Sequence, residues 1–257
     1  MGVRIYPKIF RIAQIKPKTL MSTISNIEYV HRLISHSYMK RFYKFLSILF
    51  QLLIMLILPF WLIMRGTIFL YKAYDWPFIG AILVVGLVVG FLLLIYVAMV
   101  WDAVFGANKI SRSTLKGQVF FVLFLMMGYV GYTFFNMSAA NTKGEAVKKE
   151  FSSLHPMLRL AVGTFIFLDD GLLVTDMSRK QSDYADMGLK TNKNSLHYKQ
   201  PSGFVHAMDL RTKGRSEFRN KLLQGYFWAM GFQTLRHGGT ADHLHVSLFS
   251  KDNPGAI

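Results

Sequence analysis

Side chains suited to metal chemistry gather in three short segments near the C-terminus. These are 195–198 (Ser-Leu-His-Tyr), 206–209 (His-Ala-Met-Asp) and 242–245 (Asp-His-Leu-His). The alternating sequence His-Leu-His-Val-Ser-Leu-Phe predicts a β-strand over 243–249, which places His243 and His245 on one face. Two imidazoles and a carboxylate on neighbouring strands, without a thiolate, form a three-ligand set. Such a set leaves a fourth position open to water, which is typical of catalytic zinc.

A site of this kind would hydrolyse amide bonds, because water on zinc is acidified toward neutrality and can attack a polarised carbonyl. The chain contains no cysteine, which excludes disulfides, thiol catalysis and cysteine-ligated zinc. The competing interpretation is a set of ordinary loop or surface histidines, because a His-x-His pair alone is a weak signal. We adopt that interpretation for His155 and, at first, for His237.

The order of these residues resembles that of the LAS-type zinc peptidases, a group that includes lysostaphin-like enzymes, D-Ala-D-Ala metallopeptidases and the hedgehog signalling domain. The nearest likeness is to the D-Ala-D-Ala carboxypeptidase-like branch, whose pattern runs Ser-x-His-x-x-Gly-x-Ala-x-Asp and later His-x-His. It covers roughly residues 155–250. The matching positions are Arg179, Ser195, His197, Gly203, Ala207, Asp209, Gly231, His243 and His245.

Carried over by position, the resemblance implies that His197, Asp209 and His245 are ligands of a Zn²⁺ cofactor. It implies that His243 lies beside the metal and helps to stabilise the transition state, and that Arg179 supports the site or polarises the substrate. The substrates implied are peptide bonds in the stem peptides or cross-links of peptidoglycan.

The sequence departs from the family pattern in two places. Twelve positions separate His197 from Asp209 instead of seven, which predicts an insertion within 199–206 and leaves His206 as a rival ligand. The family's glutamate general base is not found before the His-x-His pair, so Asp242 or His237 would have to replace it. Two functions therefore stay open. One is a zinc metallopeptidase, and the other is a degenerate, non-catalytic domain that binds peptidoglycan within an envelope-spanning assembly.

Three uncharged apolar stretches upstream predict transmembrane helices over 45–64, 77–101 and 118–135. The absence of ionisable residues inside them argues against a channel or transporter. The second stretch contains Gly86-x-x-x-Gly90, a spacing that lets helices approach closely. Self-association through these glycines, or assembly in an envelope complex, is a further hypothesis.

Basic residues cluster beside the predicted spans. Residues 1–136 contain 14 Lys and Arg against three acidic residues, and so carry most of the formal charge of +16. Topology and anionic lipid account for such charge, so no nucleic-acid partner is expected. Nine of these residues lie in the N-terminal arm 1–44, two in the loop 65–76 and three in the loop 102–117. This predicts a cytoplasmic (inner) membrane protein with its N-terminus inside and its C-terminal domain periplasmic or extracellular.

The predicted organisation is a basic arm (1–44), a transmembrane region (45–136), a polar linker (137–154) and a peptidase-like domain (155–257). Within the last of these, periodicity predicts helices over 158–168 and 217–231 and strands over 172–175 and 243–249. The predicted fold class is an all-α transmembrane anchor of about three helices, followed by a small α+β zinc-peptidase-like domain with an antiparallel sheet.

Overall fold

The structure is a computed structural model that describes residues 17–105, 111–135, 137–186, 188, 190–239 and 242–256, with side chains from residue 38 onward except at 103–105. The predicted N-terminal arm therefore lies partly outside the described residues. Two compact units divide at Leu53 and Ile54. The description below concerns the second unit, which holds the membrane helices from Ile54 onward and the whole C-terminal domain.

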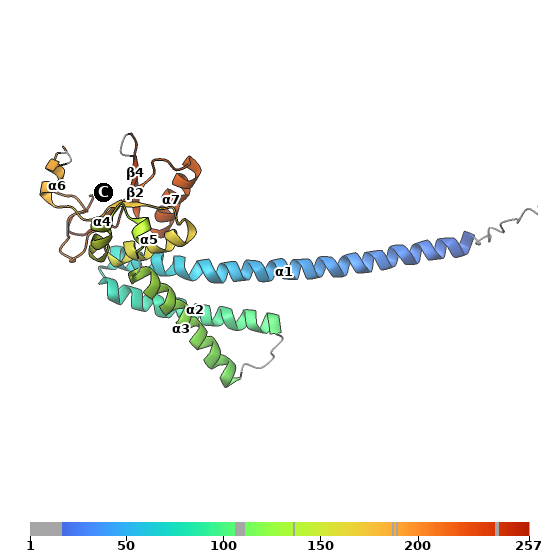
Figure 1. Cartoon of the computed structure of the whole chain (residues 1–257). Helices are drawn as coiled ribbons and strands as arrows, with labels where there is room; N and C mark the ends of the chain where they lie inside the picture. The colour runs from blue at the N-terminus through green and yellow to red at the C-terminus, as the bar shows by residue number, and fades with distance from the viewer. Residues whose placement is uncertain are drawn as a thin grey trace, which may run out of the picture. The chain divides into compact units, whose positions relative to one another are not determined.

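Three long apolar helices are present, as predicted (Figure 1). They are α1 (Pro17–Tyr74), α2 (Phe78–Phe105) and α3 (Arg112–Phe135). The apolar part of α1, Tyr38–Tyr74, has 37 residues. At 1.5 Å per residue this part is about 55 Å long, well beyond a hydrocarbon core of about 30 Å. A single span therefore requires only part of this helix.

The C-terminal domain is built around a four-stranded antiparallel sheet. The strands are β1 (Val174–Asp176), β2 (Ala207–Arg211), β3 (Gln233–His237) and β4 (His243–Ser247), in the order β1-β2-β4-β3. The helices are α5 (Pro156–Leu168), α6 (Gln181–Asp186) and α7 (Glu217–Met230). The predictions of α5, α7, β1 and β4 are confirmed, and so is the antiparallel sheet.

The two faces of the sheet have different chemistry. Met208 and Leu210 of β2 and Leu244 and Val246 of β4 are fully buried in the main core, which also contains residues of α5 and α7. Asp209, between the two buried residues of β2, points to the opposite face, because side chains alternate along a strand. One face therefore builds the core, and the other is free to carry a site.

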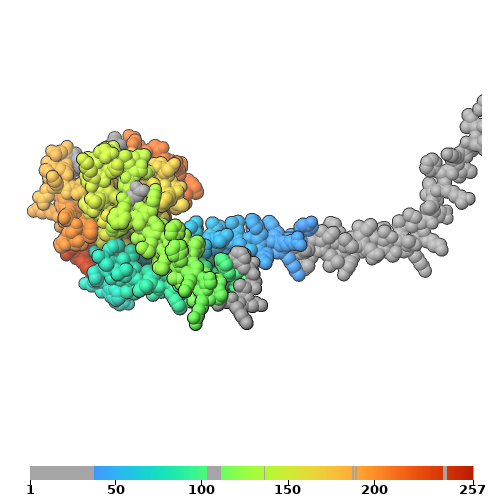
Figure 2. Space-filling model, turned by 60° about the horizontal axis from the view of Figure 1, so that its bottom comes forward, coloured from blue at the N-terminus to red at the C-terminus, as the bar shows by residue number. Residues whose placement is uncertain are grey.

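The core of the domain continues into the membrane helices. Met64 and Ile68 of α1 are buried in the same hydrophobic cluster as the sheet residues. On α5, Gly163 lies so close to α3 that an added Cβ would stand 2.9 Å from the Thr133 carbonyl oxygen. Figure 2 shows the C-terminal domain lying directly on the ends of α2 and α3. The domain and the membrane helices therefore share one packed interior.

The residues predicted as a polar linker are part of this packing. They form η1 (Ala139–Asn141), α4 (Glu145–Glu150) and η2 (Phe151–Ser153). Phe151 and the adjacent Leu154 are buried in the main core. The side-chain amide of Asn141 donates to the Leu172 carbonyl at 2.9 Å. This segment joins α3 to α5 through specific contacts.

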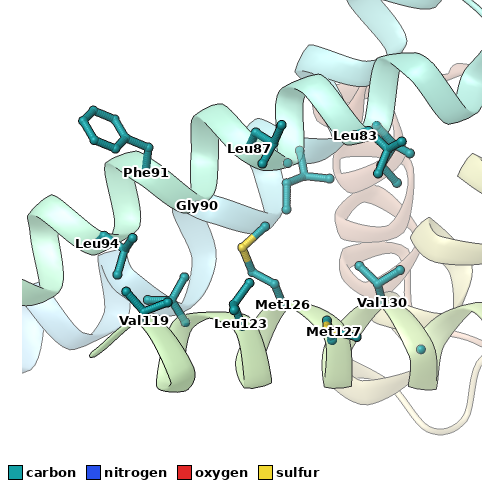
Figure 3. Close-up of a pocket in the computed structure, with 15 residues that line it drawn as sticks. Leu83, Leu87, Gly90, Phe91, Leu94, Val119, Leu123, Met126, Met127 and Val130 are labelled. Atoms are coloured by element: carbon teal, nitrogen blue, oxygen red, sulfur yellow. The ribbon is translucent and has the colours of Figure 1, made fainter. Parts of the chain in front are cut away.

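The glycine pair of α2 faces α3 of the same chain. A Cβ added at Gly90 would lie 3.3 Å from Sδ of Met126, and one at Gly86 would lie 3.9 Å from its Cε. Figure 3 shows Met126 reaching from α3 toward Gly90, beside an apolar groove of about 670 Å³. The two glycines therefore let α2 and α3 of the same chain approach closely. Self-association of two chains through these glycines stays a prediction.

Candidate metal centre

His197, Asp209 and His245 converge on the sheet face opposite the core. Nε2 of His197 lies 3.3 Å from Nδ1 of His245 and 3.4 Å from Oδ1 of Asp209. Nδ1 of His245 lies 2.8 Å from the same carboxylate oxygen. All three side chains are buried, so three donor atoms meet in a place with little access to bulk water.

Strand register brings two of these residues together. Asp209 of β2 and His245 of β4 are directly paired across the sheet, and such neighbours have Cβ atoms about 5 Å apart. His197 comes from the loop that follows α6. The Ser195 hydroxyl accepts the backbone amide of His197 at 3.3 Å and the Tyr184 hydroxyl at 2.7 Å, which ties this loop to α6.

A backbone contact fixes the chemistry of His197. Its Nδ1 lies 2.7 Å from the carbonyl oxygen of Met177, which can only accept a hydrogen bond. Nδ1 therefore donates to this carbonyl, and Nε2 faces Asp209 and His245. Metal-binding histidines commonly have this arrangement, because the second ring nitrogen donates to a carbonyl that orients the imidazole.

Arg179 holds the carboxylate of Asp209 from behind. Its Nη2 donates to Oδ2 of Asp209 at 2.6 Å, and its Nε donates to Oδ2 of Asp176 at 2.5 Å. Burial alone would raise the pKa of Asp209, but hydrogen bonds with His197 and His245 outweigh it and hold that pKa well below its usual value. The carboxylate is therefore charged and keeps Oδ1 directed at the two imidazoles.

The donor set fits a small divalent cation. Ligands on tetrahedral zinc with bonds of about 2.0–2.1 Å lie about 3.3–3.4 Å apart. The two separations that involve His197 already have this value, and the Asp209–His245 separation is a hydrogen bond of 2.8 Å. Imidazole and carboxylate together suit zinc and related metals.

His243 and His237 form the rim of the cluster. Their rings stack with centroids 4.8 Å apart, and the two residues are paired across β3 and β4. Nε2 of His243 lies 3.8 Å from Oδ2 of Asp209, so His243 lies beside the three donor atoms. The pKa of His237 is lowered, mainly by partial burial and secondly by the neighbouring His243. A neutral imidazole that can accept a proton therefore stands at the exposed edge.

Asp242, one of the two residues that we considered as a base, faces away from the cluster. Its Oδ1 accepts Nε of Arg236 at 2.7 Å and the Thr212 hydroxyl at 2.8 Å, and its Oδ2 accepts Nη2 of Arg236 at 2.8 Å. These hydrogen bonds lower the pKa of Asp242 to about 2. A carboxylate held in this way is a weak base and does not reach the three donor atoms.

The rival ligand His206 lies elsewhere. Its Nε2 is 2.8 Å from the Ser202 hydroxyl, and its ring contacts His155 at 4.8 Å between centroids. Burial lowers the pKa of His206 to about 4. The expected insertion is a tight turn in which Lys199 and Val205 pair and Gly203 adopts φ +83°. His197, which precedes this turn, lies in the cluster.

His155 is a correction to the sequence analysis, which treated it as a surface or loop residue. It is buried, and its Nδ1 accepts the Met157 amide at 3.2 Å to cap the start of α5. His237, by contrast, is exposed on β3.

We expect His197→Ala to weaken zinc binding by more than about 100-fold, because even residues that only orient a ligand contribute 10- to 100-fold to metal affinity. The matched variant His206→Ala should keep the wild-type affinity, since its imidazole lies outside the cluster. Competition with a fluorescent zinc chelator measures both. Loss of affinity in the His206 variant alone would reverse the assignment of ligands.

Sequence motifs did not identify three residues that orient the site. Met177 orients His197, Asp176 orients Arg179, and Tyr184 orients the loop at Ser195. Met177 acts through its backbone carbonyl, which leaves no side-chain signal. The spacing of Asp176 and Arg179 at i and i+3 could have indicated that these two side chains form an ion pair.

Comparisons with known proteins give no match. No family model, no curated protein and no solved structure matches this chain. The assignment of function therefore rests on the residues of the site.

Proposed function

We propose that the chain is a membrane-anchored zinc metallopeptidase that cleaves peptidoglycan stem peptides or cross-links beside a D-configured residue. The observation that carries the proposal is the convergence of His197, Asp209 and His245, with mutual separations of 2.8–3.4 Å between donor atoms. In the resemblance to LAS-type peptidases, these three residues are the zinc ligands. The proposed location is the cytoplasmic membrane with the C-terminal domain outside, where peptidoglycan lies.

Each residue of the site has a proposed task. His197, Asp209 and His245 would hold zinc, which supplies a water molecule acidified toward neutrality and polarises the carbonyl of the substrate. Arg179 orients the Asp209 carboxylate through its 2.6 Å contact. His243, beside Asp209, is placed to donate a hydrogen bond to the oxygen that becomes negative during attack.

Proton transfer is assigned to His237. Asp242 is engaged by Arg236 and Thr212, so of the two residues considered as a base it is the less suitable. His237 is exposed, stacks on His243 and has a lowered pKa, so its ring is neutral near pH 7 and can take a proton from water.

The second candidate function is a degenerate domain that binds peptidoglycan without cleaving it. The hydrogen bonds from Arg236 to Asp242 favour this alternative, because they leave this carboxylate unsuited to act as a general base. Loss of a positioned general base costs on the order of 10²–10⁴ in rate. Binding would then use the same open sheet face, and the membrane helices would anchor an envelope assembly.

The test is mass spectrometry of muropeptides after purified sacculi are incubated with the full chain in detergent and zinc. The full chain is needed because Met64 and Ile68 are part of the domain core. We expect loss of a terminal residue or an opened cross-link with wild type and with Asp242→Asn, and no cleavage with His245→Ala. Unchanged muropeptides from folded, zinc-loaded wild type, together with binding to sacculi, would support the second candidate instead.

A further inference from the structure

Five large apolar side chains are exposed along one edge of the C-terminal domain. We call them the apolar rim. Each is between 52% and 74% exposed, although the rest of the domain buries its apolar residues well. Contiguous exposed patches of this kind mark an interaction surface. The apolar rim consists of Phe167 and Leu168 at the end of α5 and Phe218, Leu222 and Trp228 on α7.

The two helices that carry the apolar rim lie side by side. The Tyr226 hydroxyl of α7 donates to the Ala161 carbonyl of α5 at 2.9 Å. At the other end of the pair, Asp169, which follows α5, forms ion pairs with Arg215 and Arg219. The helices are therefore antiparallel, and the end of α5 lies next to the beginning of α7. Phe218 and Leu222, which are neighbours on one face of α7, therefore lie near Phe167 and Leu168, and Trp228 lies toward the other end of α7.

Contacts with the membrane helices place the apolar rim at the edge of the bilayer. The Phe167 ring lies 4.8 Å from that of Tyr132, within the last turn of α3. At the end of α7, the Trp61 indole of α1 donates to the Ala229 carbonyl at 3.2 Å. Tyr132 and Trp61 both belong to apolar helices long enough to span a membrane. The apolar rim therefore continues the surface that these helices present to lipid.

The polar residues of α7 suit a helix that lies in the membrane interface. Such helices carry Trp, Phe or Leu on one face and basic residues beside it. On α7, Arg219 and Lys221 are exposed next to Phe218 and Leu222. Arg219 forms an ion pair with Asp169, whereas the long side chain of Lys221 can extend toward lipid phosphates while the apolar side chains enter the acyl boundary.

We propose that the apolar rim is a lipid-binding surface, by which the C-terminal domain is partly embedded in the leaflet on its own side of the membrane. α7 lies in the interface, with Phe218, Leu222 and Trp228 directed into lipid. The three donor atoms of the candidate metal centre lie on the opposite face of the sheet from α5 and α7, so that face is directed away from the bilayer. This inference does not depend on the proposed enzymatic activity.

The absence of cysteine from the sequence permits a direct test. Single variants Leu168→Cys, Leu222→Cys and Trp228→Cys of the full chain carry an environment-sensitive fluorophore in nanodiscs of phosphatidylcholine and phosphatidylglycerol. Ser182→Cys on α6, at the other side of the domain in Figure 1, is the control. All four positions are exposed, so the labels do not disturb the core.

Interfacial helices bury their apolar face about 5–10 Å into the headgroup and acyl boundary, so lipids with a shallow doxyl group should quench the three rim labels roughly twofold or more. Aqueous iodide should quench the Ser182 label and spare the rim labels. Rim labels that respond like the Ser182 label would overturn the proposal. Rim labels protected from both quenchers would also overturn it, because protein, a second copy included, would then cover the apolar rim.

Discussion

Asp209→Ala should abolish zinc binding at this site and, with it, any hydrolysis. The carboxylate is the one residue that contacts both imidazoles and Arg179. Its removal takes away a negatively charged ligand and leaves Arg179 close to the metal position. Because orienting residues alone contribute 10- to 100-fold to affinity, we expect a loss of more than about 100-fold. Chelator competition for zinc and the muropeptide assay are the two measurements.

Two matched aspartate variants give this result its meaning. Asp176→Asn weakens the partner that orients Arg179, and should reduce zinc affinity by about 10-fold. Asp183→Asn changes a half-buried residue of α6, whose carboxylate accepts the Lys180 amide at 2.6 Å, and should leave zinc affinity unchanged. Equal effects from all three variants would point to general destabilisation. Full activity in Asp209→Ala would remove the metal centre from the account.

Gly163→Val should break the junction between the C-terminal domain and the membrane helices. A Cβ at this position would lie 2.9 Å from the Thr133 carbonyl oxygen and 3.2 Å from its Cα, and backbone atoms of a packed helix cannot move aside cheaply. Overpacking a well-filled core costs about 1–3 kcal/mol and sometimes more. We expect at least that loss in the free energy of unfolding, measured by denaturant titration of the full chain in mild detergent.

Gly225→Ala is the control for helix propensity. Gly225 lies inside α7, and nothing stands within 4 Å of an added Cβ. Replacing an open helical glycine by alanine should stabilise the chain by about 0.5–1 kcal/mol. A Gly163→Val protein as stable as wild type would show that α5 is not packed on α3, and would also remove the contact that places Phe167 near the bilayer.

Much of the fold could be predicted, because strong periodicity and apolar length are local signals. The helix over 217–231 is an example, since its stripe and its terminal Gly231, with φ 105°, are both visible in the sequence. Strands β2 and β3 were missed. The sequence of β2, Ala-Met-Asp-Leu-Arg, lacks β-branched residues, and that of β3, Gln-Thr-Leu-Arg-His, is largely polar.

The continuity of the membrane helices with the domain could not be predicted from apolar length. Met64 and Ile68 are as apolar as residues that face lipid, so composition does not tell protein contact from lipid contact. His155 illustrates the same limit. Its burial against Phe78 and Phe204 depends on segments far apart in the chain.

The site was partly predictable. The alternation expected over 243–249 places His243 and His245 on one face, and this expectation is consistent with β4. Asp242 precedes the strand and binds Arg236. The choice between His197 and His206 depended on how the chain folds between them. The sequence does not show that Lys199 and Val205 pair and close a turn at Gly203. Tertiary contacts decided that choice.

The most direct test of the central claim is zinc K-edge X-ray absorption of the full chain loaded with one equivalent of zinc. We expect zinc bound by two imidazoles and one carboxylate, with one further light atom from water, and loss of this signature in Asp209→Ala. A six-coordinate, aquo-like spectrum, identical in wild type and variant, would contradict it.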